Sequence, residues 1–89
     1  MPELSRFFGI IISMFFNDVG KYFKPHIHAK FGEHEIILSL DGEILDGTMP
    51  RRQLALIGAW ITLHEEELYK AWIKAVRNEH PDKIEPLKG

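Results

Sequence analysis

Cysteine is absent from the 89 residues of this chain. Without thiols the protein can form neither a disulfide framework nor a thiolate metal site, and nothing in it points to an oxidising compartment. We therefore expect a cytoplasmic protein. We also expect no secretory signal, because Glu3 stands where a signal peptide would carry a basic leader.

A long hydrophobic run is also lacking. The most apolar stretch, residues 7–16, is about half the roughly 20 residues that a membrane-spanning helix requires, so we expect a strand there and no membrane association. Nor does charge of one sign dominate, since 11 basic and 13 acidic residues leave a formal net charge of -2. That balance argues against a surface devoted to nucleic acid, although a local basic patch stays open.

Hydrophobic residues make up 45% of the chain and charged residues 27%, which at this length fits one small domain, residues 1–89, with a modest core. The order of the patterns predicts an α+β fold. We expect a four-stranded antiparallel meander followed by one or two helices packed on one face of the sheet.

The clearest element is a hairpin, in which two alternating runs flank a turn at Gly32-Glu33. A two-residue turn places Lys30 opposite Glu35, which supports the register. It also sets Phe31 opposite His34, Ala29 opposite Ile36 and Ile27 opposite Leu38. Side chains alternate along a strand, so one face is apolar and the other is mixed. The mixed face carries His26, His28, Lys30, Glu35, Ile37 and Ser39.

The other strands are predicted from β-branched and aromatic runs. Residues 1–6 are a lead-in, residues 8–16 form a central strand, and residues 17–25 form a loop. Asp41-Gly42 is a strong signal for a two-residue turn into a short strand over residues 43–47.

The second half of the chain has a helical period from Leu54 to Val76, and Pro50 suits a first helical turn. The pattern favours two helices, residues 51–63 and 65–78, with Thr62 as a cap for the second; one continuous helix is the alternative. Trp60 and Trp72 are expected in the core. Residues 83–87 form an extended tail that can dock on the edge of the sheet.

His26 and His28 are the candidate catalytic residues. Imidazoles two apart on one strand point the same way, and such a pair can share a metal or serve as acid and base. A metal would need a third ligand, for which Glu35 and Asp18 are candidates. The simpler alternative is that both are surface or interface groups bonded to the backbone. We expect no metal and no cofactor.

Arg51 and Arg52 stand at a helix start, where cations are unfavourable against the helix dipole. Their placement suggests an anionic partner such as phosphate, with Lys24 and Lys30 as further candidates. The alternative is that the arginines pair with Asp46 or Glu43.

Ile11, Phe15 and Ile37 are predicted to lie on the sheet face opposite the helices. Exposed together, they would form an interface for a second copy or for another protein. The alternative is that residues 1–6 or 83–87 fold over them.

Several short motifs together resemble one family. They are Ser5-Arg6-Phe7-Phe8-Gly9-Ile10, Phe16-Asn17-Asp18, Pro25-His26-Ile27-His28, Met49-Pro50-Arg51-Arg52-Gln53-Leu54, Ala59-Trp60-Ile61 with Leu63-His64, and Lys83-Ile84-Glu85-Pro86-Leu87. The chain resembles the small bacterial family of domains of unknown function numbered four-one-six-zero. The family's usual loop carries one more histidine upstream, where this sequence has residues 19–23, so one possible metal ligand is missing.

The resemblance implies a place in a two-gene module of the toxin-antitoxin kind, and two functions compete. The first is a protein-binding module whose partner is itself or a small neighbouring gene product. The second is a toxin-like RNA-cleaving enzyme, in which His26 and His28 act as acid and base while Lys21, Lys24, Lys30, Arg51 or Arg52 hold phosphate. We favour the first, because acids dilute the positive charge around the same hairpins. They are Glu33, Glu35, Asp41, Glu43 and Asp46.

Overall fold

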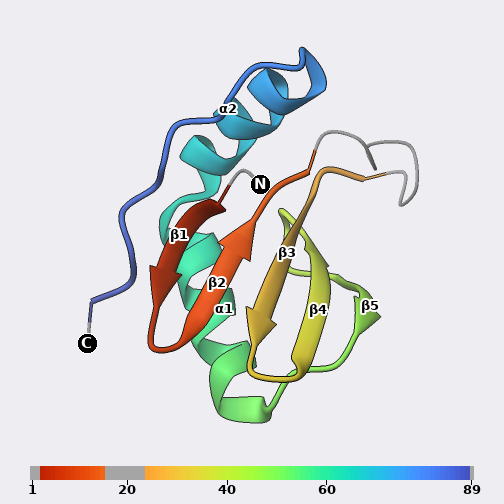
Figure 1. The fold of residues 1–89 in the computed structure, drawn as a ribbon, viewed down its shortest axis with the longest axis vertical. Helices are drawn as coiled ribbons and strands as arrows, with labels where there is room; N and C mark the ends of the chain where they lie inside the picture. The colour runs from red at the N-terminus through yellow and green to blue at the C-terminus, as the bar shows by residue number, and fades with distance from the viewer. Residues whose placement is uncertain (1–2, 16–23, 89) are drawn as a thin grey trace.

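A computed structural model describes residues 3–15 and 24–88. Five strands, β1 (Glu3–Phe7), β2 (Ile10–Ser13), β3 (His26–Phe31), β4 (His34–Ser39) and β5 (Ile44–Gly47), are followed by two helices, α1 (Arg51–Leu63) and α2 (Glu65–Val76). The strands pair in chain order as an antiparallel meander. The helices lie behind the sheet and at its upper end, so its front face has no helix across it (Figure 1). The α+β fold is therefore confirmed, but four was the wrong number of strands.

The extra strand comes from the first 15 residues. The predicted strand over residues 8–16 is wrong at its start, because Phe8 and Gly9 form a tight turn and the supposed lead-in is β1. Both turn residues have positive φ, 49° and 80°, as a two-residue type I′ turn requires. Phenylalanine seldom adopts that conformation, so the run looked continuous.

The central hairpin has the predicted register. Lys30 pairs with Glu35, Ala29 with Ile36 and Ile27 with Leu38. The next turn is longer than predicted. Gly42, at φ 93°, donates its N–H to Ser39 O over 3.0 Å, and Ser39 N donates to Glu43 O over 2.8 Å, which makes a three-residue loop. The register of β4 against β5 then shifts between Ile37 and Leu38.

The helical half divides into two helices, as favoured, although α2 ends at Val76 rather than at residue 78. Thr62 is not the cap. Its hydroxyl donates to Gly58 O at 3.0 Å, while His64 takes the N-cap position of α2 and its Nδ1 lies 2.7 Å from Glu67 Oε1. No helix in the described part of the chain is long and apolar enough to span a membrane.

The core lies between the sheet and the helices. Its largest buried side chain is Trp60, which was expected there, and the indole N–H donates to Glu85 O at 2.9 Å. That bond helps to hold the tail, whose Ile84 N–H donates to Leu4 O at 2.8 Å. The tail therefore docks beside β1 at the edge of the sheet, as predicted, and shields part of an open edge. Trp72 is partly buried against the same core.

Ser5 is a buried polar residue whose replacement by alanine should not lower the free energy of unfolding. It is buried beside Ile12, and among the described residues its Oγ is the one buried side-chain polar atom with no hydrogen-bond partner. An unpaired buried hydroxyl costs about 1–3 kcal/mol, so we expect Ser5→Ala to leave the free energy of unfolding unchanged or raise it by up to about 1 kcal/mol.

Ser39→Ala is the matched control. This buried hydroxyl bonds with the Asp41 carboxylate and accepts the Glu43 N–H at 3.0 Å, so its loss should destabilise the protein by about 1–2 kcal/mol. Urea unfolding of both variants measures the difference. Equal destabilisation by the two substitutions would contradict the burial of an unpaired group at Ser5.

Candidate functional site

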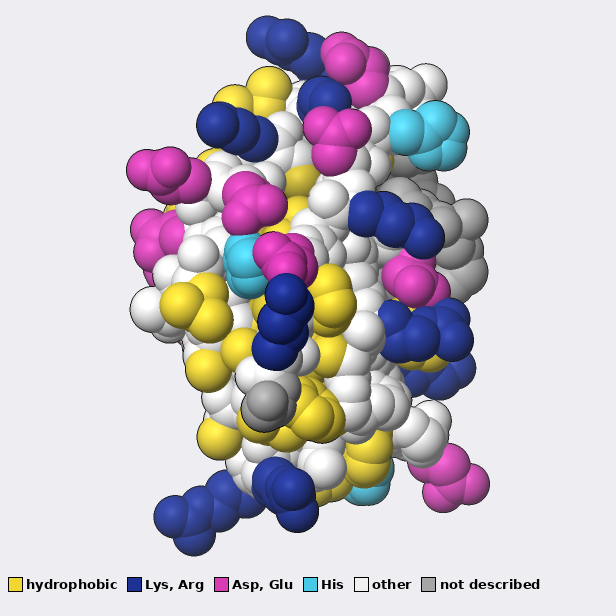
Figure 2. Space-filling model, turned by 90° about the vertical axis from the view of Figure 1, so that its left-hand side faces the viewer, with side chains coloured by type: hydrophobic (Ala, Val, Ile, Leu, Met, Phe, Trp, Pro, Cys, Tyr) yellow, Lys and Arg dark blue, Asp and Glu magenta, His cyan; other side chains and the backbone are white. Residues whose placement is uncertain are grey.

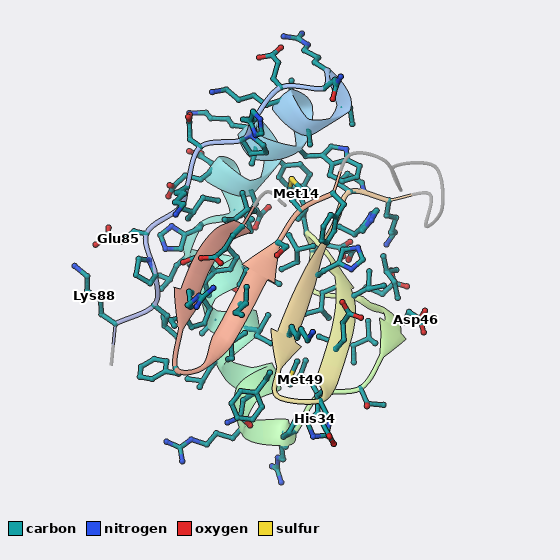
Figure 3. The ribbon with its side chains drawn as sticks, in the orientation of Figure 1. Met14, His34, Asp46, Met49, Glu85 and Lys88 are labelled. Carbon is teal, nitrogen blue, oxygen red and sulfur yellow. The ribbon has the colours of Figure 1, made fainter. Side chains whose placement is uncertain are left out.

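The front face of the sheet carries a shallow hollow, here called the sheet-face hollow. It is lined by Glu3, Arg6, Ile11, Ser13, Phe15, His28, Lys30 and Glu35. Most of these residues belong to two rows of paired residues that run across the sheet. One row runs Arg6, Ile11, Lys30, Glu35, and the next runs Glu3, Ser13, His28, Ile37. These rows lie on the sheet face opposite the core, because the alternate positions of the same strands, such as Ile12 and Ala29, are buried in the core. In Figure 3 the tail with Glu85 and Lys88 borders the sheet on the β1 side, and Asp46 lies on the β5 side.

The rim of the sheet-face hollow carries both signs of charge. Arg6 forms an ion pair with Glu3 at 2.8 Å, and this hydrogen bond lowers the pKa of the Glu3 carboxyl below its usual value. Lys30 lies opposite Glu35, whose Oε2 is 3.8 Å from His28 Nδ1. The charges alternate around an apolar floor, so the hollow is not a continuous positive groove.

The two candidate histidines lie together, with ring centroids 5.7 Å apart. The His28 ring also meets Phe15 edge-on at 4.7 Å, and the His26 ring lies 5.1 Å from Trp72 of α2. His26 is fully buried and its Nδ1 donates to Lys24 O at 2.8 Å, whereas the His28 side chain is 15% exposed. The alternative that both histidines are surface or interface groups bonded to the backbone is wrong in one respect. His26 has the backbone bond but is not at the surface, because α2 brings Trp72 against its ring. Only His28 lines the hollow.

A metal site was weighed for these histidines. The structure brings Glu35 beside His28, while Asp18 lies outside the described residues. Within residues 3–15 and 24–88, no three His, Asp or Glu side chains lie close enough together to hold a metal ion.

The four candidate phosphate-binding cations do not come together. Lys24 pairs with Asp41 at 3.5 Å and with Glu43, and the hydrogen bond to Glu43 raises the pKa of the lysine above its usual value. Lys30 lies in the sheet-face hollow at the other end of β3.

Arg51 and Arg52 are exposed at the start of α1 and form no ion pair with the described residues. The alternative, that the arginines pair with Asp46 or Glu43, is therefore wrong. Glu43 pairs with Lys24, and the Asp46 carboxylate accepts the Gly47 N–H at 2.8 Å. Arg52 instead borders a second hollow with Phe8, Phe31, Gln53 and Leu56, at the lower end of the molecule.

Comparison with protein families decides what the chain is related to. The model of Domain of unknown function (DUF4160) matches residues 9–73. The chain belongs to this family. Comparison with curated proteins and with solved structures found no match. The DUF4160 match runs from the first turn into α2, so it includes the floor of the sheet-face hollow but not Glu3 and Arg6 on its rim.

The predicted interface of this DUF4160 chain is only partly exposed. Ile11 and Phe15 are half-buried on the front face, but Ile37, which shares that face beside His28, is buried. The alternative was that residues 1–6 or 83–87 fold over these three side chains. It is wrong for the described residues, because residues 3–7 extend the sheet and the tail runs along its edge. The front face offers a smaller apolar area than three exposed side chains would.

Sequence reasoning missed Glu3 and Arg6. Both were placed in a lead-in, although they pair with Ser13 and Ile11 and supply half of the charge around the hollow. The signal that could have found them was the glycine at position 9, because glycine readily adopts the positive φ that a tight turn requires.

We expect the stability of the fold to depend on pH through Asp41, in the loop between β4 and β5. The Ser39 hydroxyl first, then the Glu43 N–H and Lys24, hold the pKa of Asp41 below its ordinary value of 3.8. A carboxyl whose pKa is lower in the folded state stabilises the fold above its unfolded-state pKa, and this contribution is lost as the pH falls through the folded-state value.

We therefore expect Asp41→Asn to lower the urea midpoint at pH 7, and the gap from wild type to narrow when the pH is taken below the ordinary value of 3.8, as protonation removes the charge of Asp41. Urea titrations at the two pH values measure it. A gap of the same size at both would show that the charge of Asp41 contributes nothing.

Proposed function

We propose that this DUF4160 protein is a cytoplasmic protein-binding module whose partner docks on the sheet-face hollow. The observation that carries the proposal is the hollow itself, a partly exposed apolar floor of Ile11 and Phe15 on the face that the helices leave open. A small apolar centre within a polar rim is the usual anatomy of a protein interface.

The charges around the floor favour a protein over a polyanion. Glu3 and Glu35 would repel a phosphate chain that approached Arg6 or Lys30, whereas a protein surface can present both signs. We infer a partner that inserts an apolar or aromatic side chain over Ile11 and Phe15. Its acidic groups would face Arg6 and Lys30, and its basic groups would face Glu35.

The family resemblance suggests a source for that partner. We propose the small protein encoded beside this one, in a two-gene module of the toxin-antitoxin kind. Gene association alone carries no mechanism, so the proposal depends on direct binding.

Calorimetric titration with the purified neighbouring gene product tests the proposal. We expect saturable binding to wild type, weakened at least about tenfold by Phe15→Lys and by Ile11→Lys, because each places a charge on the apolar floor. Ile44→Lys is the matched control. This residue of β5 is 52% exposed but lies outside the hollow, so its substitution should leave the affinity unchanged. No binding by wild type, or equal weakening by Ile44→Lys, would refute the proposal.

RNA cleavage is the second candidate, favoured by the presence of His28 and Lys30 in one hollow. It is the weaker proposal, because His26 is buried and Lys24 is held by two carboxylates. Incubation with labelled RNA separates the two functions. Cleavage that is lost in His28→Ala would make the protein an enzyme.

A further inference from the structure

The helix α2 carries apolar side chains on two sides. Leu68, Ala71 and Ala75 are buried against the core. Tyr69, Ile73 and Val76 remain 41%, 50% and 47% exposed, and their spacing of four and three residues places them on one outward face, here called the α2 stripe. A helix that packs on one side needs a single apolar stripe, and the core formed by the described residues uses the side of Leu68, Ala71 and Ala75.

Among residues 3–15 and 24–88, the other elements leave the α2 stripe exposed. The tail packs along a different side of α2, where Glu67, Lys70, Ala71 and Lys74 border a pocket with Asp82 and Ile84. The helix reaches beyond the upper end of the sheet (Figure 1), and none of its residues is among those that line the sheet-face hollow. At this end of the molecule a few hydrophobic side chains lie among acidic and basic ones (Figure 2).

The two ends of α2 carry opposite charges. Three acids fill the first turn, Glu65, Glu66 and Glu67, while Lys74 lies in the last turn and Arg77 is the C-cap. Glu66 and Arg77 are 11 residues apart, a separation of about 16 Å along the axis and only about 20° around it. They therefore flank the α2 stripe on the same side. Neither forms an ion pair with the described residues.

We propose that the α2 stripe is the interface for a second copy of this chain, with the two α2 helices antiparallel. In that arrangement a two-fold axis crosses the middle of the helix, Glu66 of each copy meets Arg77 of the other, and the stripes pack together between them. The helix dipoles also oppose each other favourably. A parallel pair would instead bring the three acids of one copy against the three acids of the other.

This inference goes beyond the proposed function and uses a different surface. One pair of short helices lies at the low end of the size range of specific interfaces, so we expect a dimer that forms at roughly tens of micromolar protein.

Sedimentation equilibrium tests the contact. Wild type should show a concentration-dependent dimer, and Ile73→Glu should remain monomeric, because it puts a carboxylate at the centre of the α2 stripe. The control Ile44→Glu changes a residue of similar exposure on β5 and should dimerise like wild type.

Charge reversal tests the antiparallel orientation. Glu66→Arg and Arg77→Glu should each weaken the dimer about tenfold or more, because like charges then meet twice. The double variant should regain wild-type affinity. An equimolar mixture of the two single variants should form a heterodimer tighter than either homodimer, which also shows that both variants are folded.

Three results would overturn the proposal. The first is a wild type that stays monomeric up to about 1 mM, a concentration at which even a weak interface of this size is populated. The others are a double variant that dimerises no more tightly than the single variants, or equal weakening of the dimer by Ile73→Glu and Ile44→Glu. Binding of the partner at the sheet-face hollow is tested independently of this dimer. Ile73→Glu should keep its affinity for the neighbouring gene product, and Phe15→Lys should keep its dimer.

Discussion

Gly47→Ala is expected to lower the free energy of unfolding by about 2–4 kcal/mol, because the new methyl group meets both backbone strain and a steric clash. Gly47 ends β5 with φ 84°, a conformation that side chains rarely allow. A Cβ atom there would lie 2.2 Å from the carbonyl oxygen of Glu35, which is fixed backbone that also accepts the Thr48 N–H at 3.2 Å. The end of β5 would have to separate from β4.

Gly58→Ala is the control for this prediction. Gly58 lies in α1 with nothing within 4 Å of its virtual Cβ, so alanine should raise stability by up to about 1 kcal/mol through helix propensity. Urea unfolding of both variants gives the comparison. Similar effects of the same sign at the two positions would contradict the close approach of Gly47 to β4.

Trp60→Ala is expected to cost about 3–5 kcal/mol, the range for deleting a large buried aromatic side chain. The indole is fully buried, lies 5.6 Å from the Phe7 ring, and bonds to Glu85 O. It therefore joins α1 to β1 and to the tail, and its removal leaves a cavity among all three.

Trp60→Phe separates packing from hydrogen bonding. It keeps most of the apolar volume but leaves the Glu85 carbonyl without its donor, so we expect a smaller loss of about 1–2 kcal/mol. The amide of Ile84, which bonds to Leu4 O, should then exchange its hydrogen faster. Tyr69→Ala, at an exposed ring, should cost less than about 1 kcal/mol. A loss in Trp60→Ala no larger than in Tyr69→Ala would contradict the central position of the indole.

The central hairpin could be predicted from the sequence because two independent signals agree there. The alternation of Ile27, Ala29, Ile36 and Leu38 requires one face to be buried, and Gly32, with φ 58°, supplies the turn that fixes the register. The break between the helices was also predictable, from the three acids that begin α2.

The first hairpin could not be predicted in the same way. Phe8 adopts a left-handed conformation that tertiary pairing of β1 with β2 imposes, and no local preference of phenylalanine indicates it. That one error removed Glu3 and Arg6 from the candidate site.

The burial of His26 depends on Trp72, which comes from α2 late in the chain. Likewise, periodicity alone shows that α2 is apolar on more than one side but does not say which side meets the core. Such contacts depend on how distant elements pack, so sequence patterns do not contain them.

The most direct test of the sheet-face hollow as a binding site is chemical-shift mapping by NMR, with labelled protein and the unlabelled neighbouring gene product. We expect the amide signals of Ile11, Ser13, His28, Lys30 and Glu35 to shift on saturation, while those of Arg51 and Arg52 stay in place. Shifts confined to α1 or α2, with the front face of the sheet unchanged, would contradict the proposal that this face binds the partner.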